Sequence, residues 1–365
     1  MRRIVLIILA IFVLTLFAGC IVKDEAITYS AKKPVEAPTA TPEPTPLAAY
    51  PETIVQWMIP FSQATDIDYW SRAMGDAFSE SYDWRVMYTN ISGGLSGSTG
   101  TYKVFNSNHD GYMFSTFGER TLTIPVYVEG EITTKDWEYF IAGGCPSILS
   151  VGPDIGPNTI EEFITAAKNI EEDNELTIAV SGGGLQAALP YYFVTESGIN
   201  FNIKEYKTDE DARNACKNSE VDAVISPANV IAYDIERKRL IPLAVMEDKA
   251  YTNHSFYKNT IPSIRDTVPS LKQEALIALR QLRGFALPID TEKSKLLSID
   301  EAFKGLADNA TFGEFVKNTF ANMYLYTGQE AKNQVELSER YLCWILSDMN
   351  KAGYTPEYVG IERPY

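Results

Sequence analysis

The chain has 365 residues, of which 45% are hydrophobic, 22% charged and 12% aromatic, and this composition excludes a disordered or collagen-like polymer. Its 48 acidic residues outnumber 32 basic ones and give a net charge of −16. A chain this acidic is not expected to bind nucleic acid, because neutralising phosphates takes clustered Lys and Arg. The length suggests two domains.

The first 19 residues predict an export signal. Arg2 and Arg3 precede an apolar run over residues 4–17, and Ala18-Gly19-Cys20 follows. This ending resembles the lipobox of bacterial lipoproteins, which implies that residues 1–19 are a lipoprotein signal peptide and that Cys20 is lipidated. An uncleaved signal anchor is the alternative, since the apolar stretch approaches the ~20 residues that span a bilayer. Both interpretations place the rest of the chain outside the cytoplasm.

Residues 20–50 are rich in proline, with Thr, Ala and Glu between the prolines. Such a segment has few apolar groups to bury and favours extended polyproline conformations. We interpret it as a stalk that holds a folded body away from a membrane.

The body alternates strands and helices. Short apolar runs predict strands at residues 54–60, 84–88, 112–115, 176–180, 203–206, 221–226, 241–245 and 284–288. Helical spacing predicts helices from residue 66 onwards and at 160–170, 185–195, 208–217 and 228–236, and the remainder up to residue 350 is expected to be mostly helical. Residues 137–151 are expected to lead into a second domain. Repeated strand–loop–helix units predict an α/β fold with parallel sheets covered by helices on both faces.

Small and hydroxylic residues follow several predicted strands. Ligands of such sheets bind beyond the carboxyl ends of the strands, so we expect loops 62–66, 92–100, 181–184 and 226–229 to surround one cleft. The candidate ligand-binding residues are Ser62, Gln63, Thr65, Asp66, Gly93, Gly94, Ser96, Gly97, Ser181, Gly182, Gly183, Gly184, Pro227 and Asn229.

Glycine lets a backbone approach a ligand closely, and a helix N-terminus offers free N–H donors to an anion. The loops at Thr65-Asp66 and Gly183-Gly184-Leu185 lead directly into predicted helices. The sequence therefore predicts capture of a carboxylate or another anion by neutral donors, without a buried ammonium or guanidinium group. Taken singly, each loop is also compatible with an ordinary turn, since Gly and Ser are common turn residues.

Catalytic motifs are missing from the sequence. The Gly-rich segment 93–100 has no following Lys of a nucleotide-binding loop, and Ser96 is not in a G-x-S-x-G motif. The two histidines, His109 and His254, are expected at the surface, and no cofactor or metal is expected. Buried free thiols are expected at Cys145, Cys216 and Cys343, which could form at most one disulfide.

A series of motifs in the body resembles the solute-binding receptors of tripartite tricarboxylate transporters, the TctC or Bug family. Its order and spacing carry the resemblance from about residue 54 to 288. The motifs are Pro60-Phe61 with Thr65-Asp66, Gly93-Gly94 with Gly100, Asp110-Gly111-Tyr112, Ser181-Gly182-Gly183-Gly184, Val221-Asp222, Ser226-Pro227-Ala228-Asn229, Leu243-Ala244-Val245 and Ile261-Pro262-Ser263.

Two departures from the family pattern stand in the ligand loops. Ser62-Gln63-Ala64 replaces the family's Gly-Gly, and Leu185 and Ala188 stand where the family has a hydroxyl residue and a His. The ligand is therefore expected to be larger, less charged or held differently.

The resemblance implies an α/β, two-lobed periplasmic-binding-protein type II fold with a ligand cleft between the lobes. We expect lobe 1 to comprise residues 51–150 and 246–365, and lobe 2 residues 151–245. The resemblance also implies a lipid-anchored, extracytoplasmic protein that captures a small organic acid for a membrane permease and has no enzymatic activity. A sensor of the same fold that signals to a membrane kinase is the alternative, and an extracytoplasmic enzyme is disfavoured because no nucleophile–base pair is visible.

Overall fold

The computed structural model describes residues 50–129, 132–169, 175–181, 183–253, 257 and 259–364. The chain divides after residue 46, and its second unit, residues 47–365, is compact. The predicted signal peptide, Cys20 and all of the stalk but residue 50 lie outside the described residues. All described residues belong to the second unit.

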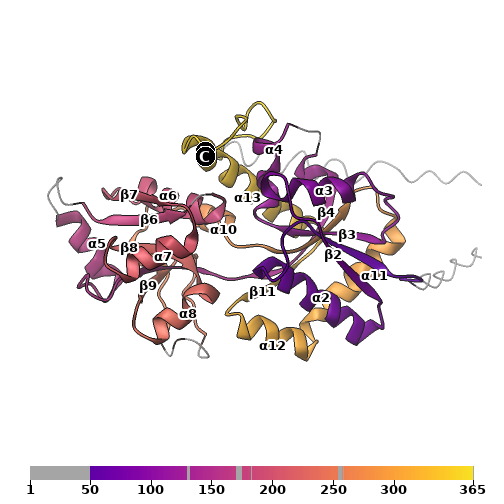
Figure 1. The fold of residues 1–365 in the computed structure, drawn as a ribbon, viewed down its shortest axis with the longest axis horizontal. Helices are drawn as coiled ribbons and strands as arrows, with labels where there is room; N and C mark the ends of the chain where they lie inside the picture. Colours follow the sequence, from indigo (N-terminus) through magenta and orange to yellow (C-terminus); the bar gives the residue numbers. More distant parts are fainter. Residues whose placement is uncertain are drawn as a thin grey trace, which may run out of the picture. The chain divides into compact units, whose positions relative to one another are not determined.

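Two sheets organise this unit (Figure 1). The first has the order β11-β4-β10-β3-β1-β2 and the second the order β7-β6-β8-β5-β9. The strands of the first sheet are β1 (Val55–Ile59), β2 (Val86–Asn90), β3 (Met113–Gly118), β4 (Trp137–Gly144), β10 (Arg283–Pro288) and β11 (Asn322–Tyr326). Those of the second are β5 (Ser147–Val151), β6 (Thr177–Ser181), β7 (Asn202–Tyr206), β8 (Ala223–Pro227) and β9 (Ile241–Val245).

Both sheets are mixed, so the expectation of parallel sheets is wrong. β1 pairs in parallel with β2 and β3, and β6 does so with β7 and β8. In contrast, β10 runs antiparallel to β3 and β4, and β5 runs antiparallel to β8 and β9. Two of the reversed strands, β5 and β10, stand next to the crossings between the sheets: β5 directly follows β4 of the other sheet, and β10 is the first strand after the chain returns.

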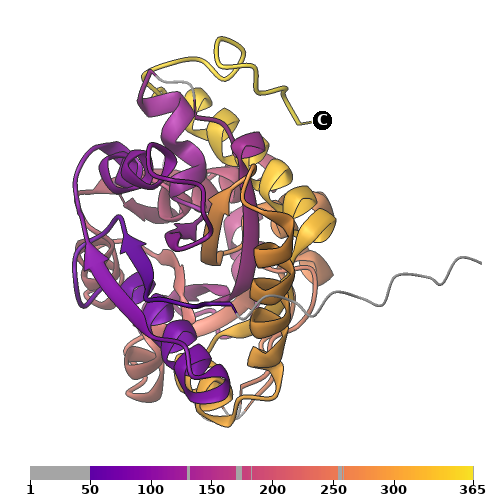
Figure 2. The same ribbon diagram turned by 90° about the vertical axis from the view of Figure 1, so that its right-hand side faces the viewer.

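Helices cover the sheets, and those near the C-terminus lie along one side of the strands (Figure 2). The helices are α2 (Asp66–Tyr82), α3 (Ser98–Phe105), α4 (Ile124–Tyr127), α5 (Ile160–Asn169), α6 (Leu185–Glu196), α7 (Asp209–Lys217), α8 (Ala228–Glu236), α9 (Ile264–Thr267), α10 (Gln273–Ala278), α11 (Lys293–Lys304), α12 (Ala310–Asn318) and α13 (Gly328–Asp348). Short 3₁₀ turns are η1 (Leu95–Gly97), η2 (Thr121–Thr123), η3 (Thr134–Asp136) and η5 (Gly305–Ala307).

Helix α2 shows why the sequence folds this way locally. Its apolar residues Ile67, Trp70, Met74 and Phe78 recur every three or four positions and are all buried. The helix ends where Asp83 adopts a left-handed conformation, with φ of 58°.

Three strands were not predicted as strands from the sequence. β4 and β5 lie within residues 137–151, which were expected only to lead into a second domain. The stretch after β10 was predicted to be mostly helical, yet β11 lies between α12 and α13 and pairs antiparallel with β4. All five of its residues are half-buried. The segment therefore lacks the alternation of buried and exposed residues that identifies a strand.

Each sheet has its own hydrophobic core. Large aromatic rings fill the core of the first sheet, where Phe285 stacks on Phe114 and Phe140 with centroids 4.7 and 4.8 Å apart. The backbones of β10 and β4 approach each other so closely beside that ring that only glycine fits at position 284. A Cβ on Gly284 would lie 1.9 Å from the carbonyl oxygen of Phe140. Leu, Ile, Val and Ala dominate around the second sheet.

Helix α13 packs against both groups of elements. Its first turns contact β4, with Val335 in the core that also holds Ile141. Farther along, Leu342 and Ile345 belong to the core of the second sheet, where the helix meets α6 and α10. The helix therefore belongs to both lobes.

The predicted lobe limits at residues 150 and 245 stay predictions. All strands of the second sheet lie between residues 147 and 245. Helices α9 and α10, however, bury Ile264 and Leu276 in the core of that sheet. This packing favours a return to the first lobe near residue 279 over a return at residue 245.

Candidate functional site

A cleft of about 720 Å³ is lined by elements that belong to both sheets. Its size suits a small-molecule ligand, since such sites commonly hold several hundred Å³. The lining residues are Asp66, Leu95, Ser96, Arg120, Tyr127, Ser181, Gly183, Gly184, Gln186, Lys207, Asp209, Pro227, Asn229, Val230, Gln281, Arg283 and Lys351.

Each of the four loops that we expected around one cleft contributes to this lining. Among the candidate residues, the cleft brings together Asp66, Ser96, Ser181, Gly183, Gly184, Pro227 and Asn229. Six candidates from two of the loops do not line it: Ser62, Gln63, Thr65, Gly93, Gly94 and Gly97. Gly182 lies outside the described residues.

Local hydrogen bonds explain why some candidates are turned away. The hydroxyl of Thr65 donates to the carbonyl of Ser62 at 2.8 Å, which closes the turn before α2. The carbonyl of Gly93 accepts the N–H of Thr99 at 3.4 Å, which closes the turn before α3. These residues shape the loops, and the residues after them reach the cleft.

The expectation of neutral donors alone is wrong. Four basic side chains line the cleft: Arg120, Lys207, Arg283 and Lys351. The strand-end rule could have found the first two, because Arg120 follows β3 and Lys207 follows β7. It could not have found Arg283, which opens the antiparallel strand β10, or Lys351, which follows α13.

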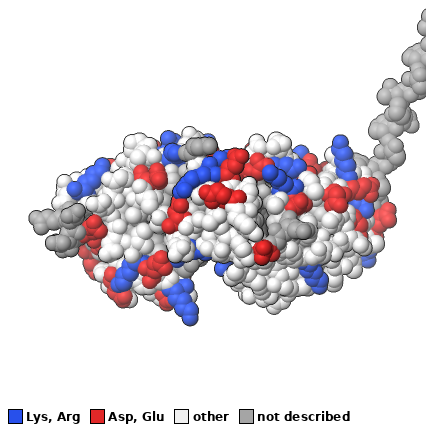
Figure 3. All heavy atoms as spheres, turned by 90° about the horizontal axis from the view of Figure 1, so that it is seen from above, with Lys and Arg blue, Asp and Glu red and all other residues white. Residues whose placement is uncertain are grey.

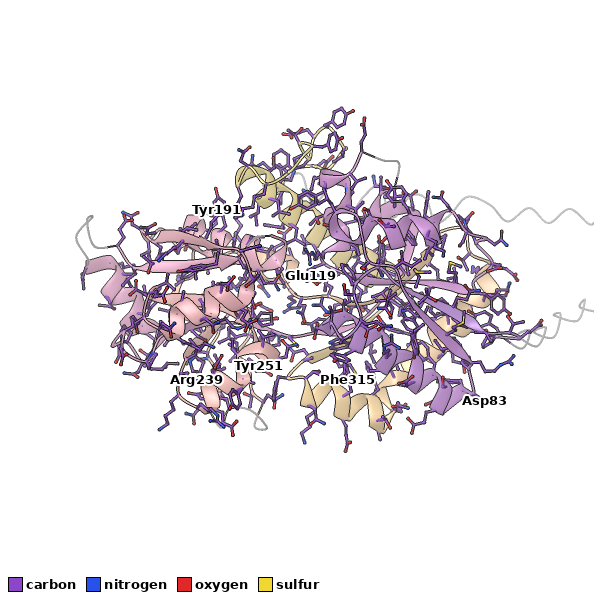
Figure 4. All side chains as sticks on the ribbon, in the orientation of Figure 1. Asp83, Glu119, Tyr191, Arg239, Tyr251 and Phe315 are labelled. Carbon is purple, nitrogen blue, oxygen red and sulfur yellow. The ribbon has the colours of Figure 1, made fainter. Side chains whose placement is uncertain are left out.

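Arg283 anchors a buried network at the centre of the molecule. Its Nε donates to Asp66 Oδ2 at 2.7 Å and its Nη1 to Glu119 Oε2 at 2.6 Å. Burial alone would lower the pKa of Arg283, but the carboxylates of Glu119 and Asp66 raise it above its ordinary value. Glu119 lies between the two sheets (Figure 4) and also accepts the backbone N–H of Leu282. Arg283 is therefore permanently charged and held in place.

Asp66 links the two lobes directly. While its Oδ2 accepts from Arg283, its Oδ1 accepts Asn229 Nδ2 at 2.8 Å. Asp66 opens α2 beside the first sheet, and Asn229 stands in the first turn of α8 beside the second. One carboxylate thus joins a buried cation of one lobe to an amide of the other.

The loop before α6 has the geometry of an anion-binding turn. Gly184 is the N-cap of α6 with φ of 64°, a conformation that glycine adopts without strain. The first N–H groups of a helix lack internal partners and attract negative charge. Ser181 and Gly183 line the cleft beside this helix start.

Several chemistries find no support among the described residues. None of their clusters of His, Cys, Asp and Glu could hold a metal ion. Cys145, Cys216 and Cys343 are buried free thiols, as expected. Burial raises the pKa of Cys216 to about 12, so this thiol is not activated as a nucleophile. His109 contacts Asp290 outside the cleft lining, and His254 is not described.

In the described ranges, every helix is too short or too polar to cross a bilayer. Over the centre of one face, basic and acidic side chains lie close together (Figure 3).

Solved structures share this fold. A TctC solute-binding protein from Polaromonas is 19% identical with a TM-score of 0.65, and the match covers 83% of this chain and 99% of that protein. A Rhodopseudomonas palustris protein solved with adipate is 18% identical with a TM-score of 0.61, covering 86% and 100%. MatC from the same organism, solved with bound malate, is 13% identical with a TM-score of 0.58, covering 80% and 98%. No curated protein sequence matches this chain.

Two lobes around a polar cleft define the class: this is the fold of the periplasmic solute-binding proteins. Residues 72–341 match the family model described as the tripartite tricarboxylate transporter family receptor, TctC. The chain belongs to this family, which confirms the resemblance seen in its motifs. It is an extracytoplasmic solute-binding receptor and not an enzyme.

Proposed function

We propose that this receptor captures a small carboxylate-bearing metabolite in the cleft and delivers it to a membrane permease of the tripartite tricarboxylate type. The observation that carries the proposal is the cleft lining, in which the basic side chains of Arg120, Lys207 and Lys351 and the glycine turn before α6 come from elements of both lobes. Basic groups and helix N-termini are the donors that carboxylates prefer. Two structural relatives were solved with adipate and malate, which supports this ligand class.

Within the cleft, we propose that Ser96, Ser181, Gly183 and Gly184 donate to ligand oxygens. Ser96 is held near the cleft by a hydrogen bond with the hydroxyl of Thr123 at 2.7 Å. Pro227 and Asn229 also line the cleft from the second lobe. The six candidates that do not line the cleft are proposed to shape its loops rather than to contact the ligand: Ser62, Gln63, Thr65, Gly93, Gly94 and Gly97.

Binding of organic acids tests the proposal. The full chain, purified in detergent, is titrated with a panel of mono-, di- and tricarboxylates while its thermal unfolding is followed. A ligand present at a hundredfold excess over its Kd adds about 2.7 kcal/mol to the free energy of unfolding. Ser181→Trp should abolish the response, because an indole would fill the space beside α6. No shift with any acid of the panel would contradict the proposal.

We further propose that lipidation of Cys20 anchors the receptor, with residues 20–50 as the stalk. The support is the sequence Ala18-Gly19-Cys20 after an apolar run. Labelling with a fatty-acid analogue should mark the wild-type chain and leave Cys20→Ala unlabelled. Labelling of both chains, or of neither, would contradict the anchor.

An uptake experiment distinguishes a transport receptor from a sensor. Loss of the partner permease should abolish uptake of the bound acid by cells that contain the receptor. Unchanged uptake would instead favour a sensor of the same fold that signals to a membrane kinase.

A further inference from the structure

We propose that the cleft holds two negative charges of its ligand at one place, a cation cluster formed by Arg120, Lys207 and Lys351, and that Lys351 determines this specificity. The inference rests on the proposed function and narrows its ligand class to acids whose two carboxylates stand close together. Lys351 lies beyond residues 72–341, the part of the chain that matches the family model. The cluster is therefore completed by a segment outside the family match.

Neighbouring strands bring two of these cations together. Ser181 and Tyr206 are register partners at the ends of the parallel strands β6 and β7. The residues that come after them, Gly183-Gly184 and Lys207, consequently enter the cleft side by side. Arg120 approaches from the first lobe, since a Cβ built on Gly184 would lie 3.9 Å from its Cγ.

Lys351 reaches the same place from the C-terminal segment. Its Nζ donates to Glu205 Oε2 at 3.1 Å, and Glu205 stands on β7 two residues before Lys207. The segment is fixed on the other lobe, where the N–H groups of Gly353 and Tyr354 both donate to the carbonyl of Val126. The side chain of Lys351 is only 18% exposed, so the fold places it rather than leaving it in solvent.

The cluster carries charge that the protein does not neutralise. The side chains of Arg120 and Lys207 have no hydrogen-bond or ion-pair partner among the described residues, and both residues are exposed. Glu205, the partner of Lys351, is 60% exposed and can be replaced by a ligand oxygen. The cluster therefore has three cations and a single exchangeable carboxylate, that of Glu205. It lies beside the start of α6, and the dipole of this helix adds positive potential. A dianionic group matches this excess.

Among the described residues, the rest of the cleft offers no second anion site. Arg283 is the cation there, and it is already bound by Asp66 and Glu119, so this set carries a net negative charge. Asp209 is occupied by Arg213 and by the hydroxyl of Ser226. A carboxylate at the far end of an extended ligand would meet Asp66 without a free cation. A ligand whose far end is uncharged fits this part of the cleft better.

Isomeric diacids test the inference. Ethylmalonate and glutarate have the same atoms and the same charge when fully ionised, but ethylmalonate carries both carboxylates on one carbon and glutarate carries them at opposite ends. Butylmalonate and pimelate form a second, longer pair. Kd values are measured by calorimetry on the full chain in detergent at pH 8. We expect the malonate of each pair to bind at least tenfold more tightly than its linear isomer.

Variants assign the effect to Lys351. Lys351→Gln should remove most of the preference, whereas Lys351→Arg should keep it. Glu205→Gln frees the lysine without removing its charge, so malonate affinity should stay or rise. Lys304→Gln, which breaks an exposed pair with Asp300 in α11, is the matched control and should change nothing.

The outcomes are distinguishable. If the linear isomers bind as tightly as the malonates, or if another acid binds and neither malonate does, the inference is wrong and the proposed function stands. If no acid of any kind binds, the proposed function fails and the inference fails with it. A preference that survives Lys351→Gln removes Lys351 from the explanation.

Discussion

The two lobes differ in what fills them and in how the chain builds them. The first sheet combines β1 to β4 with β10 and β11, so segments more than 100 residues apart must meet, and rings of Trp57, Phe114, Phe140 and Phe285 pack at the meeting place. The second sheet comes from one continuous stretch and is filled mainly by aliphatic side chains.

The difference in core composition accompanies a difference in chain closure. Bringing distant segments together costs conformational entropy that grows slowly with the length of the intervening chain. Aromatic rings bury more area per residue than aliphatic side chains and add favourable edge and stacked contacts. The first lobe has its largest rings where distant segments join. In the second sheet, β5 and its partners β8 and β9 lie less than 100 residues apart.

The contrast between the two hydrophobic cores is tested most strongly at Phe285. This ring contacts Trp57, Phe114, Phe140 and Phe303 at the centre of the first core. We expect Phe285→Ala to lower the free energy of unfolding by about 3–5 kcal/mol, since it leaves a large cavity. Urea unfolding followed by tryptophan fluorescence measures the change. Ile225→Ala in β8 is the counterpart in the second core, and an equal or larger loss there would contradict the contrast.

A somewhat smaller loss is expected when the buried charge between the lobes is removed. Arg283→Met leaves Glu119 buried without its cation, which should cost about 3 kcal/mol. Adding Glu119→Gln to Arg283→Met should recover part of that loss, because no buried carboxylate then remains unpaired. Denaturation curves of the single and double variants measure both steps. Additive losses would show that the two residues do not act as a pair.

A buried carboxyl group on α13, that of Glu339, offers a pH-dependent test, since this helix belongs to both lobes. Burial raises the pKa of Glu339 from 4.5 to about 7, and the hydrogen bond from Thr134 offsets only part of this shift. Between these values the folded protein keeps a proton that the unfolded chain releases, so stability from Glu339 falls as pH rises through that window. Glu339→Gln cannot ionise.

We therefore expect the stability of Glu339→Gln relative to wild type to increase by on the order of 2 kcal/mol between about pH 4.5 and 8. Thermal unfolding of both chains across this range is the measurement. Glu330→Gln, in the first turn of the same helix, is the control variant. A difference that is constant with pH would refute the assignment.

The smallest effect is expected at the hydrogen bond between the lobes. Asn229→Ala removes the donor to Asp66, and a bond of this kind contributes about 1 kcal/mol. Equilibrium unfolding should show this modest loss, and Asn218→Ala at the exposed end of α7 serves as the control. A loss no larger than that of the control would mean that the bridge does not hold the lobes.

Much of the fold could be predicted because local patterns agree with the tertiary structure. The helical spacing from Asp66 to Phe78 and the apolar run before it predicted α2 and β1 closely. The four loops reached one cleft because parallel strands end at the same edge of a sheet. β11 escaped detection, since all of its residues are half-buried and its partner β4 lies far away in sequence.

The charged part of the site was harder to foresee for a physical reason. Arg283 and Lys351 enter through an antiparallel strand and a C-terminal segment, so no local rule places them near Ser181. Their positions depend on where the chain returns after the second lobe. Arg120 and Lys207 come after predicted strands but lack the small or hydroxylic character by which the loops were selected.

Because α13 is part of both cores, the two lobes are packed against the same helix. A hinge movement that opens the cleft has to twist around this helix or shear its packing against α10, while the connections near residues 145 and 280 bend. The C-terminal segment with Lys351 continues directly from the same helix. Ligand capture at one end of α13, the longest of the described helices, is thus mechanically coupled to the orientation of the whole second lobe.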